Sequence, residues 1–150
     1  MNCVLEYFEK CGLGMHRAGP VALKAHNPYW IEAAAFEAQR LSRSIGAGFA
    51  IHHVGSTSIS CIHAKPILDL LVVAPALASI DRVRSQFERL GYECKGEYGI
   101  PGRRYFVLYD RRKTKGYVHV HAFASGHAEV RRHLLFRDFL RADGVAARRY

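Results

Sequence analysis

At 150 residues, with 49% hydrophobic side chains and a net charge of +9, the chain has the length and apolar content of one domain with its own core. No apolar run approaches the roughly 18 to 20 residues of a membrane-spanning helix, and acidic Glu6 and Glu9 stand where a secretion signal would be basic and then apolar, so we predict a cytoplasmic protein without a membrane partner. The four cysteines include no C-x-x-C pair, which argues against a zinc knuckle or a disulfide framework and favours free thiols.

The first half of the chain predicts one helix and two strands. Residues 1–25 match no pattern, and we assign them to an N-terminal extension before a domain spanning 26–150. Asn27 and Pro28 are typical of a helix start, and Gly46 and Gly48 of its end. The apolar residues at helical spacing in between are Ile31, Ala34, Ala35, Ala38, Leu41 and Ile45. Residues 49–54 predict a strand, and the nearly continuous apolar run 66–73 predicts a second strand buried on both faces.

The second half predicts a further helix, three strands and a last helix. Apolar residues at helical spacing predict a helix over 79–90, closed by Gly91, and residues 92–94 suit a short strand. Strands over 104–110 and 116–123 are joined by a basic hairpin loop, and the last helix runs from residues 125–127 to Gly144. This order predicts an α/β (α+β) domain with a mixed sheet and helices packed on it. Alternation on strand 116–123 places on one face Tyr117, His119, His121 and Phe123.

Asp69 lies in the middle of the buried strand 66–73. An ionised carboxylate taken out of water costs several kcal/mol or more unless a cation, a metal or hydrogen-bond donors meet it. The turn Gly55-Ser56-Thr57 directly follows the preceding strand. Glycine lets a ligand approach the backbone, while hydroxyls and free amides bind anions. The turn is therefore either a phosphate cradle or an ordinary turn with a capping hydroxyl.

These pieces together resemble a known superfamily. A strand ending in Gly-Ser, a gap of 12 residues and a strand with an embedded aspartate form the layout of nucleotidyltransferases, in which the turn holds triphosphate and the aspartate holds a divalent metal. The strings HHVGSTSI, AKPILDL, GIPGRRYF, YVHVHAF and FRDFLR resemble, in order and spacing, the GrpB family (UPF0157) of nucleotidyltransferase-like domains over residues 26–150. The resemblance implies a nucleotidyltransferase-like mixed β-sheet and a nucleotide-binding site. It also implies that relatives can be joined to a dephospho-coenzyme A kinase, whose phosphate-binding signature this chain lacks.

The candidate catalytic residues depart from the superfamily pattern. Leu71 stands where a second acid would follow Asp69, and the strand that would supply a third carboxylate carries His119 and His121. Imidazole suits zinc, iron or nickel better than magnesium. The three side chains could hold one divalent metal of unknown identity, could act as general acid and base, or could be hydrogen-bonded residues of a half-buried face. We therefore predict that Asp69 lies within about 10 Å of both histidines.

Several cations are candidates for binding a substrate. Lys65 lies at the head of the Asp69 strand, and Arg103 and Arg104 precede an aromatic residue, a composition that can hold a phosphate and stack a base. Each could instead be a solvated surface charge. Arg137 and Asp138 lie amid apolar residues of the last helix, so we expect one of them to point inward and to be paired. The candidate substrate-binding residues are Gly55, Ser56, Thr57, Lys65, Arg103, Arg104 and Arg137.

Two functions follow from these patterns. The first is binding of a nucleotide or another phosphorylated small molecule, with metal-assisted nucleotidyl or phosphoryl transfer as its catalytic form. The second is a non-catalytic accessory module that binds RNA or an acidic protein. It rests on residues 103–150, which carry 12 Lys and Arg against 4 Asp and Glu, a net charge of +8.

Overall fold

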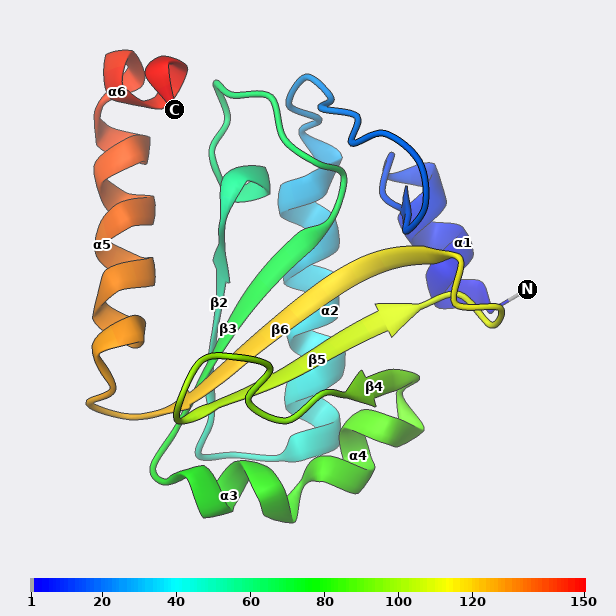
Figure 1. Ribbon diagram of the computed structural model, residues 1–150, viewed down its shortest axis with the longest axis vertical. Coiled ribbons are helices and arrows are strands. Elements are labelled where there is room, and N and C mark those ends of the chain that lie inside the picture. The colour runs from blue at the N-terminus through cyan, green and yellow to red at the C-terminus, as the bar shows by residue number, and fades with distance from the viewer. Residues whose placement is uncertain (1) are drawn as a thin grey trace.

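Six strands form one mixed sheet in the computed structural model, which describes residues 2–150 (Figure 1). Five of them lie side by side in the order β2 (Ala50–Val54), β3 (Leu68–Ala74), β6 (Lys115–Ala124), β5 (Arg103–Tyr109) and β4 (Tyr92–Cys94). Strands β3 and β6 run parallel, and the other neighbours run antiparallel. The short strand β1 (Met15–His16) pairs with the start of β6. The predicted mixed sheet is confirmed, as is the pairing of strand 66–73 with strand 116–123.

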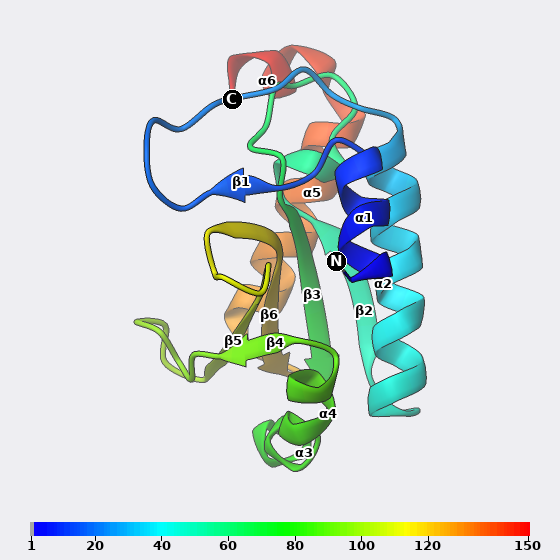
Figure 2. The ribbon, with the colours of Figure 1, turned by 90° about the vertical axis from the view of Figure 1, so that its right-hand side faces the viewer.

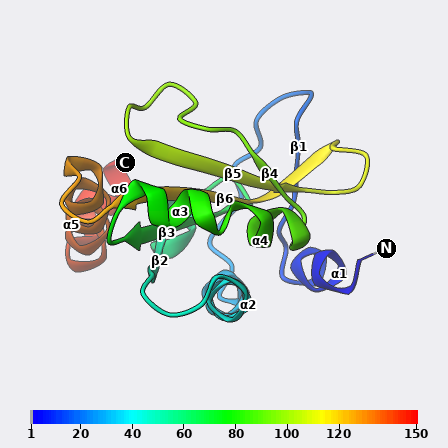
Figure 3. The ribbon, with the colours of Figure 1, turned by 90° about the horizontal axis from the view of Figure 1, so that it is seen from below.

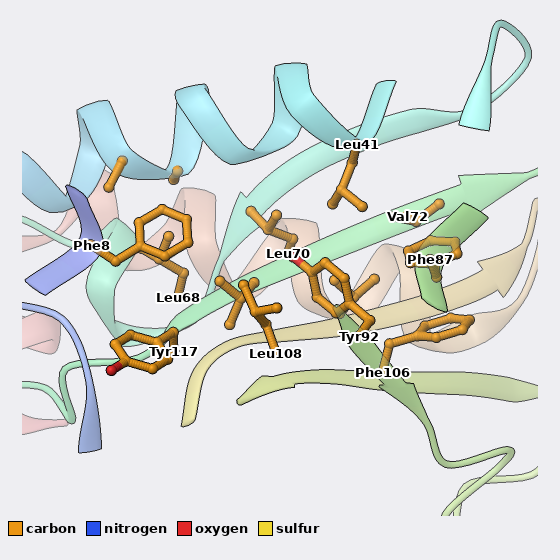
Figure 4. Close-up of a cluster of buried hydrophobic side chains, with 14 of the residues drawn as sticks. Phe8, Leu41, Leu68, Leu70, Val72, Phe87, Tyr92, Phe106, Leu108 and Tyr117 are labelled. Atoms are coloured by element: carbon orange, nitrogen blue, oxygen red, sulfur yellow. The ribbon is translucent and has the colours of Figure 1, made fainter. Parts of the chain in front are cut away.

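Helices cover the two faces of the sheet unequally. Four helices, α1 (Cys3–Lys10), α2 (Tyr29–Ile45), α3 (Leu77–Arg82) and α4 (Arg84–Arg89), pack on one face and bury the main core there (Figure 4). The β4–β5 loop projects on the other side of the sheet from α1 and α2 (Figures 2 and 3). Helices α5 (Ala128–Ala142) and α6 (Gly144–Arg149) lie beside β2 (Figure 1). The face that carries the predicted site is therefore only partly covered.

Helix α2 confirms its predicted start and buries part of its predicted apolar stripe. The Asn27 side chain accepts a hydrogen bond from the Tyr29 amide at 2.9 Å, as expected of a cap. Of the apolar residues at helical spacing, Ala34, Leu41 and Ile45 are buried, whereas Ile31 is 42% exposed and Ala35 is exposed as well. Trp30, Ala33 and Glu37 complete the buried face of the helix.

Three other elements differ from prediction. The helix expected over 79–90 is two helices, because the backbone of Val83 (φ −104°, ψ 12°) leaves the helical region between α3 and α4. A new helix, α6, follows α5 because the Asp143 side chain caps it by accepting from the amides of Val145 and Ala146. The N-terminal extension, apart from Met1, which lies outside the described residues, contributes α1 and β1 to the domain. Its buried residues Leu5 and Phe8 join the main core.

Tyr117 lies on the opposite face from the one predicted. Leu108 pairs with Val118 and Tyr109 with Gly116, so β6 holds one extra residue at Tyr117. A bulge of this kind interrupts the alternation of side chains. Tyr117 therefore packs in the main core, with its ring 6.5 Å from that of Phe8.

A buried ion pair links α2 to the β4 edge of the sheet. Glu37 has no exposed surface, and Arg40 donates to its carboxylate from Nε at 2.5 Å and from Nη2 at 2.8 Å. The hydroxyl of buried Tyr92 on β4 donates to the same carboxylate at 2.5 Å. Arg40 also donates to the carbonyl of Leu90 at the end of α4. The carboxylate therefore joins α2 to β4, and its partner Arg40 joins α2 to the end of α4.

We predict that Glu37→Ala lowers the free energy of unfolding by about 3 to 5 kcal/mol, because it leaves the guanidinium of Arg40 without its counter-charge. Chemical denaturation measures the change. Tyr92→Phe is the matched control, because it keeps the ion pair and removes one hydrogen bond, at a cost of about 1 to 3 kcal/mol. A loss for Glu37→Ala no larger than that of the control would contradict this role.

Candidate functional site

The parallel pairing of β3 and β6 brings Asp69 and the two histidines together. The register sets Asp69 beside His119 and Leu71 beside His121. The Nε2 atom of His121 lies 3.0 Å from Oδ1 of Asp69, and Nδ1 of His119 lies 3.8 Å from the same oxygen. The side chains are 30%, 29% and 15% exposed for Asp69, His119 and His121. The prediction that Asp69 faces both histidines is confirmed, and the cluster is half-buried.

Arg103 fixes the position of the His121 proton. Its Nη1 atom lies 3.3 Å from Nδ1 of His121, and a guanidinium can only donate. Nδ1 must therefore accept, which leaves the ring proton on Nε2, where it is donated to Asp69. Arg103 is 6% exposed and is itself held by the carbonyls of Glu97 and Tyr98 in the β4–β5 loop. The loop, Arg103, His121 and Asp69 thus form one hydrogen-bonded chain.

The ionisation of the cluster follows from these contacts. Burial acts to raise the pKa of Asp69, but the hydrogen bond from His121 and the histidine charges outweigh it and lower the pKa below its ordinary value. Burial lowers the pKa of His119, against the opposite effect of the Asp69 carboxylate. The charges of Lys65 and Lys95 lower it further. At neutral pH the cluster therefore combines an ionised carboxylate with an uncharged His119 that can accept a proton.

The turn after β2 lies directly on Asp69. Gly55 has φ +75°, and a Cβ atom at this position would lie 2.7 Å from Oδ2 of Asp69. The close approach expected of this glycine exists, and its partner is the aspartate side chain. Thr57 is buried against Nε2 of His53 at 2.9 Å, and Ser58 donates to the Gly55 carbonyl at 2.6 Å. Of the turn residues, Ser56 remains half-exposed and within reach of a ligand.

Helix α5 brings two arginines to this turn. Arg137 donates from Nη1 to the carbonyl of His53 at 3.3 Å and pairs with Asp138 at 2.9 Å, so the predicted inward, paired residue is Arg137. Arg141, one turn further along, donates to the carbonyl of Ser58 at 3.0 Å. The sequence analysis missed Arg141 and His53. The four-residue spacing from Arg137 was the available signal for Arg141.

Of the remaining predicted binding residues, Lys65 lies near the histidine cluster and Arg104 does not. Lys65 is exposed and contributes its charge to the surroundings of His119. Arg104 lies on the opposite face from Arg103, because neighbours on a strand alternate, and it pairs with Asp81 at 2.8 Å. It does not belong to the site. Lys95, which was not predicted, does contribute its charge and lies 5.3 Å from the centre of the Tyr98 ring.

The donor set does not fit the expected metal centre. Both ring nitrogens of His121 are engaged, one by Arg103 and one by Asp69, and both histidines approach the same carboxylate oxygen. Leu71, in the position of a second acid, is fully buried. Among residues 2–150, no group of three or more His, Cys, Asp and Glu side chains has an arrangement suited to a metal ion. The residues of the cluster suit a hydrogen-bonded acid–base centre better than metal ligation.

Comparisons with known proteins identify the relatives of this chain. The family model described as GrpB protein matches residues 20–150. The UPF0157 protein YqkA of Bacillus subtilis is 40% identical over 131 residues, and a UPF0157 protein of Streptomyces coelicolor is 33% identical over 132 residues. These alignments cover 87% of this chain but 37% and 67% of the two relatives, so the chain is shorter than they are.

Solved structures show the same fold. The crystal structure of the conserved protein GrpB from Enterococcus faecalis superposes with a TM-score of 0.77 at 36% identity, covering 83% of this chain and 74% of that one. The Cid1 poly(U) polymerase in its MgGTP-bound form superposes with a TM-score of 0.53 at 13% identity, covering 94% of this chain and 42% of the polymerase. The fold is therefore nucleotidyltransferase-like. No helix within residues 2–150 is long and apolar enough to cross a membrane.

We predict that Gly55→Ala destabilises the protein by more than the roughly 1 to 2 kcal/mol expected for a left-handed non-glycine residue, because the new methyl group would also displace the carboxylate of Asp69. Gly48→Ala is the matched control, since Gly48 has φ +97° and nothing within 4 Å of its added Cβ. Urea denaturation of both variants separates backbone strain from the clash. Equal losses would show that the contact with Asp69 is unimportant.

A second prediction concerns pH. Burial, aided by Arg141 and Arg137, lowers the pKa of His53 to about 4, below its ordinary value. As the pH falls, His53 therefore takes up a proton in the unfolded chain at a higher pH than in the folded protein. The free energy of unfolding is at its full value above about pH 6.5 and decreases as the pH falls from about 6.5 to 4. The loss approaches about 3 kcal/mol, since one pKa unit corresponds to about 1.4 kcal/mol. His53→Gln flattens this slope in denaturation measured against pH, whereas the same change at exposed His63 does not. An unchanged slope in His53→Gln would contradict the assignment.

Proposed function

The chain belongs to the GrpB family and has a nucleotidyltransferase-like fold, and from this premise we propose that it binds a nucleotide or another phosphorylated small molecule beside Asp69, His119 and His121. The observation that carries the proposal is the environment of His119. This half-exposed imidazole makes no hydrogen bond to another residue of the range 2–150, and it lies among the charges of Lys65, Asp69 and Lys95, the last of which is also paired with Glu93 at 3.1 Å. An exposed histidine with two lysines nearby attracts an anionic group.

Two aromatic rings beside this charge favour a ligand with a flat ring, such as a nucleobase. Tyr98 is 64% exposed, and its ring centre lies 5.3 Å from that of Tyr105. Tyr105 in turn lies against both histidines, at 5.6 and 5.3 Å between ring centres. Aromatic side chains at the edge of a charged site can stack a base while the cations hold its phosphates. The half-exposed hydroxyl of Ser56 offers a further hydrogen bond from the turn beside Asp69.

The chemistry that we propose is proton transfer by His119. Its lowered pKa keeps the ring uncharged near neutral pH, so it can accept the proton of a hydroxyl group or water whose oxygen attacks the bound phosphorus atom. As that bond forms, the bond from phosphorus to the terminal phosphate or pyrophosphate breaks, and this group leaves with the bonding electrons. Asp69 stabilises the imidazolium that results, and His121 and Arg103 hold Asp69 in place. In this form of group transfer, no step relies on the second and third carboxylates that the chain lacks. The cytoplasm is the compartment that we propose, since all four cysteines are free thiols.

The alternative of an RNA-binding module has weaker support. The basic residues of the C-terminal third are divided between two parts of the molecule, because the β5–β6 hairpin lies at one side of the sheet and α5 with α6 at the other (Figure 1). A continuous basic surface is the usual footprint of a protein that follows a phosphate backbone. Two structures of Cid1, which shares the fold, contain bound nucleotides, MgGTP in one and MgATP in the other. We therefore favour the small molecule.

The test is thermal unfolding with nucleoside mono-, di- and triphosphates and with pyrophosphate, each with and without Mg²⁺, Mn²⁺ and Zn²⁺. A ligand at 100 times its Kd stabilises by about 2.7 kcal/mol, which raises Tm by roughly 5 to 10 °C for a domain of this size. We predict that His119→Gln and Lys65→Ala reduce this shift. Arg104→Ala, on the opposite face, is the control and retains it.

Two results would contradict the proposal. One is the absence of a shift with every compound. The other is an equal shift in wild type and His119→Gln, which would place the ligand elsewhere. A steep loss of RNA binding between low and physiological salt, together with no nucleotide shift, would favour the RNA-binding alternative.

A further inference from the structure

A second concave site lies on the helix-covered side of the sheet. The cavity has a volume of about 1140 Å³ and is lined by residues of α1, α4, β4 and the β5–β6 hairpin. Its lining includes no residue of the histidine cluster. Four buried residues, each at most 6% exposed, give it an apolar and aromatic floor: Leu5, Tyr92, Leu108 and Tyr117. A cavity of this size exceeds the usual 300 to 1,000 Å³ of small-molecule sites.

The lining of the cavity carries five cationic side chains and four carboxylates, a net charge of +1, and not all of the cations are paired within the described residues. Three cations on its rim have carboxylate partners: Lys113 with Glu93 at 2.9 Å, Lys115 with Glu9 at 3.2 Å, and Arg84 with Glu88 at 3.7 Å. Arg111 and Arg112 also line the cavity, and neither forms an ion pair with any residue of the range 2–150. Two adjacent exposed arginines without an ion pair in that range therefore line the cavity, beside Asp110, whose carboxylate accepts hydrogen bonds from Thr114 and Lys115.

The hairpin that carries these arginines is held in place. Asp110 accepts hydrogen bonds from the amide of Thr114 at 2.7 Å, from its hydroxyl at 2.7 Å and from the amide of Lys115 at 3.0 Å. The backbone amide of Arg17, just after β1, donates a hydrogen bond to the carbonyl of Thr114 in the same turn at 2.9 Å. The loop backbone is thus ordered without a ligand, which lowers the entropy cost of binding.

We propose that this cavity binds an anionic small molecule with an apolar or aromatic body. Arg111 and Arg112 hold its acidic group through charge-assisted hydrogen bonds, and the floor formed by Leu5, Tyr92 and Leu108 receives its body. Guanidinium groups bind carboxylates, sulfonates and phosphates through two parallel hydrogen bonds. The site is independent of the function proposed for the histidine cluster, and either can fail without the other.

The first experiment uses 8-anilinonaphthalene-1-sulfonate, an aromatic anion whose fluorescence rises in apolar surroundings, as the probe. We expect saturable binding that weakens at least tenfold in the double variant Arg111→Ala, Arg112→Ala. The control replaces Arg148 and Arg149, two adjacent exposed arginines of α6, by alanine and leaves the affinity unchanged. An unchanged affinity in the Arg111 and Arg112 variant would overturn the proposal.

The second experiment locates the probe through Cys94, which lines the cavity and is half-buried. With the exposed thiols removed by Cys3→Ser and Cys61→Ser, and with Cys11 buried, alkylation by iodoacetamide reports on Cys94. Saturating probe should slow this alkylation severalfold, and the loss of both hairpin arginines should abolish the protection. Alkylation at the same rate with and without the probe would show that it binds elsewhere, and would overturn the proposal.

Discussion

The hydrogen-bonded chain from Arg103 through His121 to Asp69 is the interaction on which the site depends. A carboxylate in the middle of a central strand needs donors, and the parallel pairing of β3 and β6 supplies the imidazole of His121 at 3.0 Å. The guanidinium of Arg103 then fixes the tautomer of that imidazole and joins it to the β4–β5 loop. The turn at Gly55 closes over the other carboxylate oxygen, where a side chain would not fit. Strand pairing, loop conformation and turn are thereby coupled through one aspartate.

The hydrogen bonds from Arg103 through His121 to Asp69 lie where the resemblance to nucleotidyltransferases would lead one to expect metal ligands. The fold is nucleotidyltransferase-like, and the sequence resemblance implies that Asp69 corresponds to a metal-binding aspartate of that pattern. Here Asp69 instead accepts a hydrogen bond from the imidazole of His121, which Arg103 contacts from its other side. A hydrogen bond from a neutral imidazole stabilises a half-buried carboxylate without a metal ion. The fold alone does not supply the chemistry of the site, which is why the proton-transfer role that we propose for His119 rests on its own surroundings. Fold likeness alone would not have supported that role.

The sequence predicted those parts of the structure that depend on local pattern. The apolar content of residues 66–73 and the alternation of residues 116–123 predicted two strands of the sheet. The same alternation placed His119 and His121 on one face, so their contact with Asp69 could be predicted once the two strands were taken as neighbours. Tyr117 was predicted on the wrong face because a β-bulge depends on the pairing between β5 and β6, which the sequence of β6 alone does not reveal. Arg103 was expected to bind phosphate, and only the fold of the β4–β5 loop turns it toward loop carbonyls and His121. Glu37 was missed because its partner Tyr92 lies 55 residues away.

The protonation of His121 tests this account most directly. Two-bond ¹H–¹⁵N correlation spectra of the protein with labelled histidine distinguish a protonated from an unprotonated ring nitrogen, and His121→Gln assigns the signals. The account predicts one tautomer near pH 7, with a proton on Nε2, which donates to Asp69, and with Nδ1 unprotonated, which accepts from Arg103. A proton on Nδ1 in the wild-type protein would contradict the chain from Arg103 to Asp69, and with it the acid–base interpretation of the site.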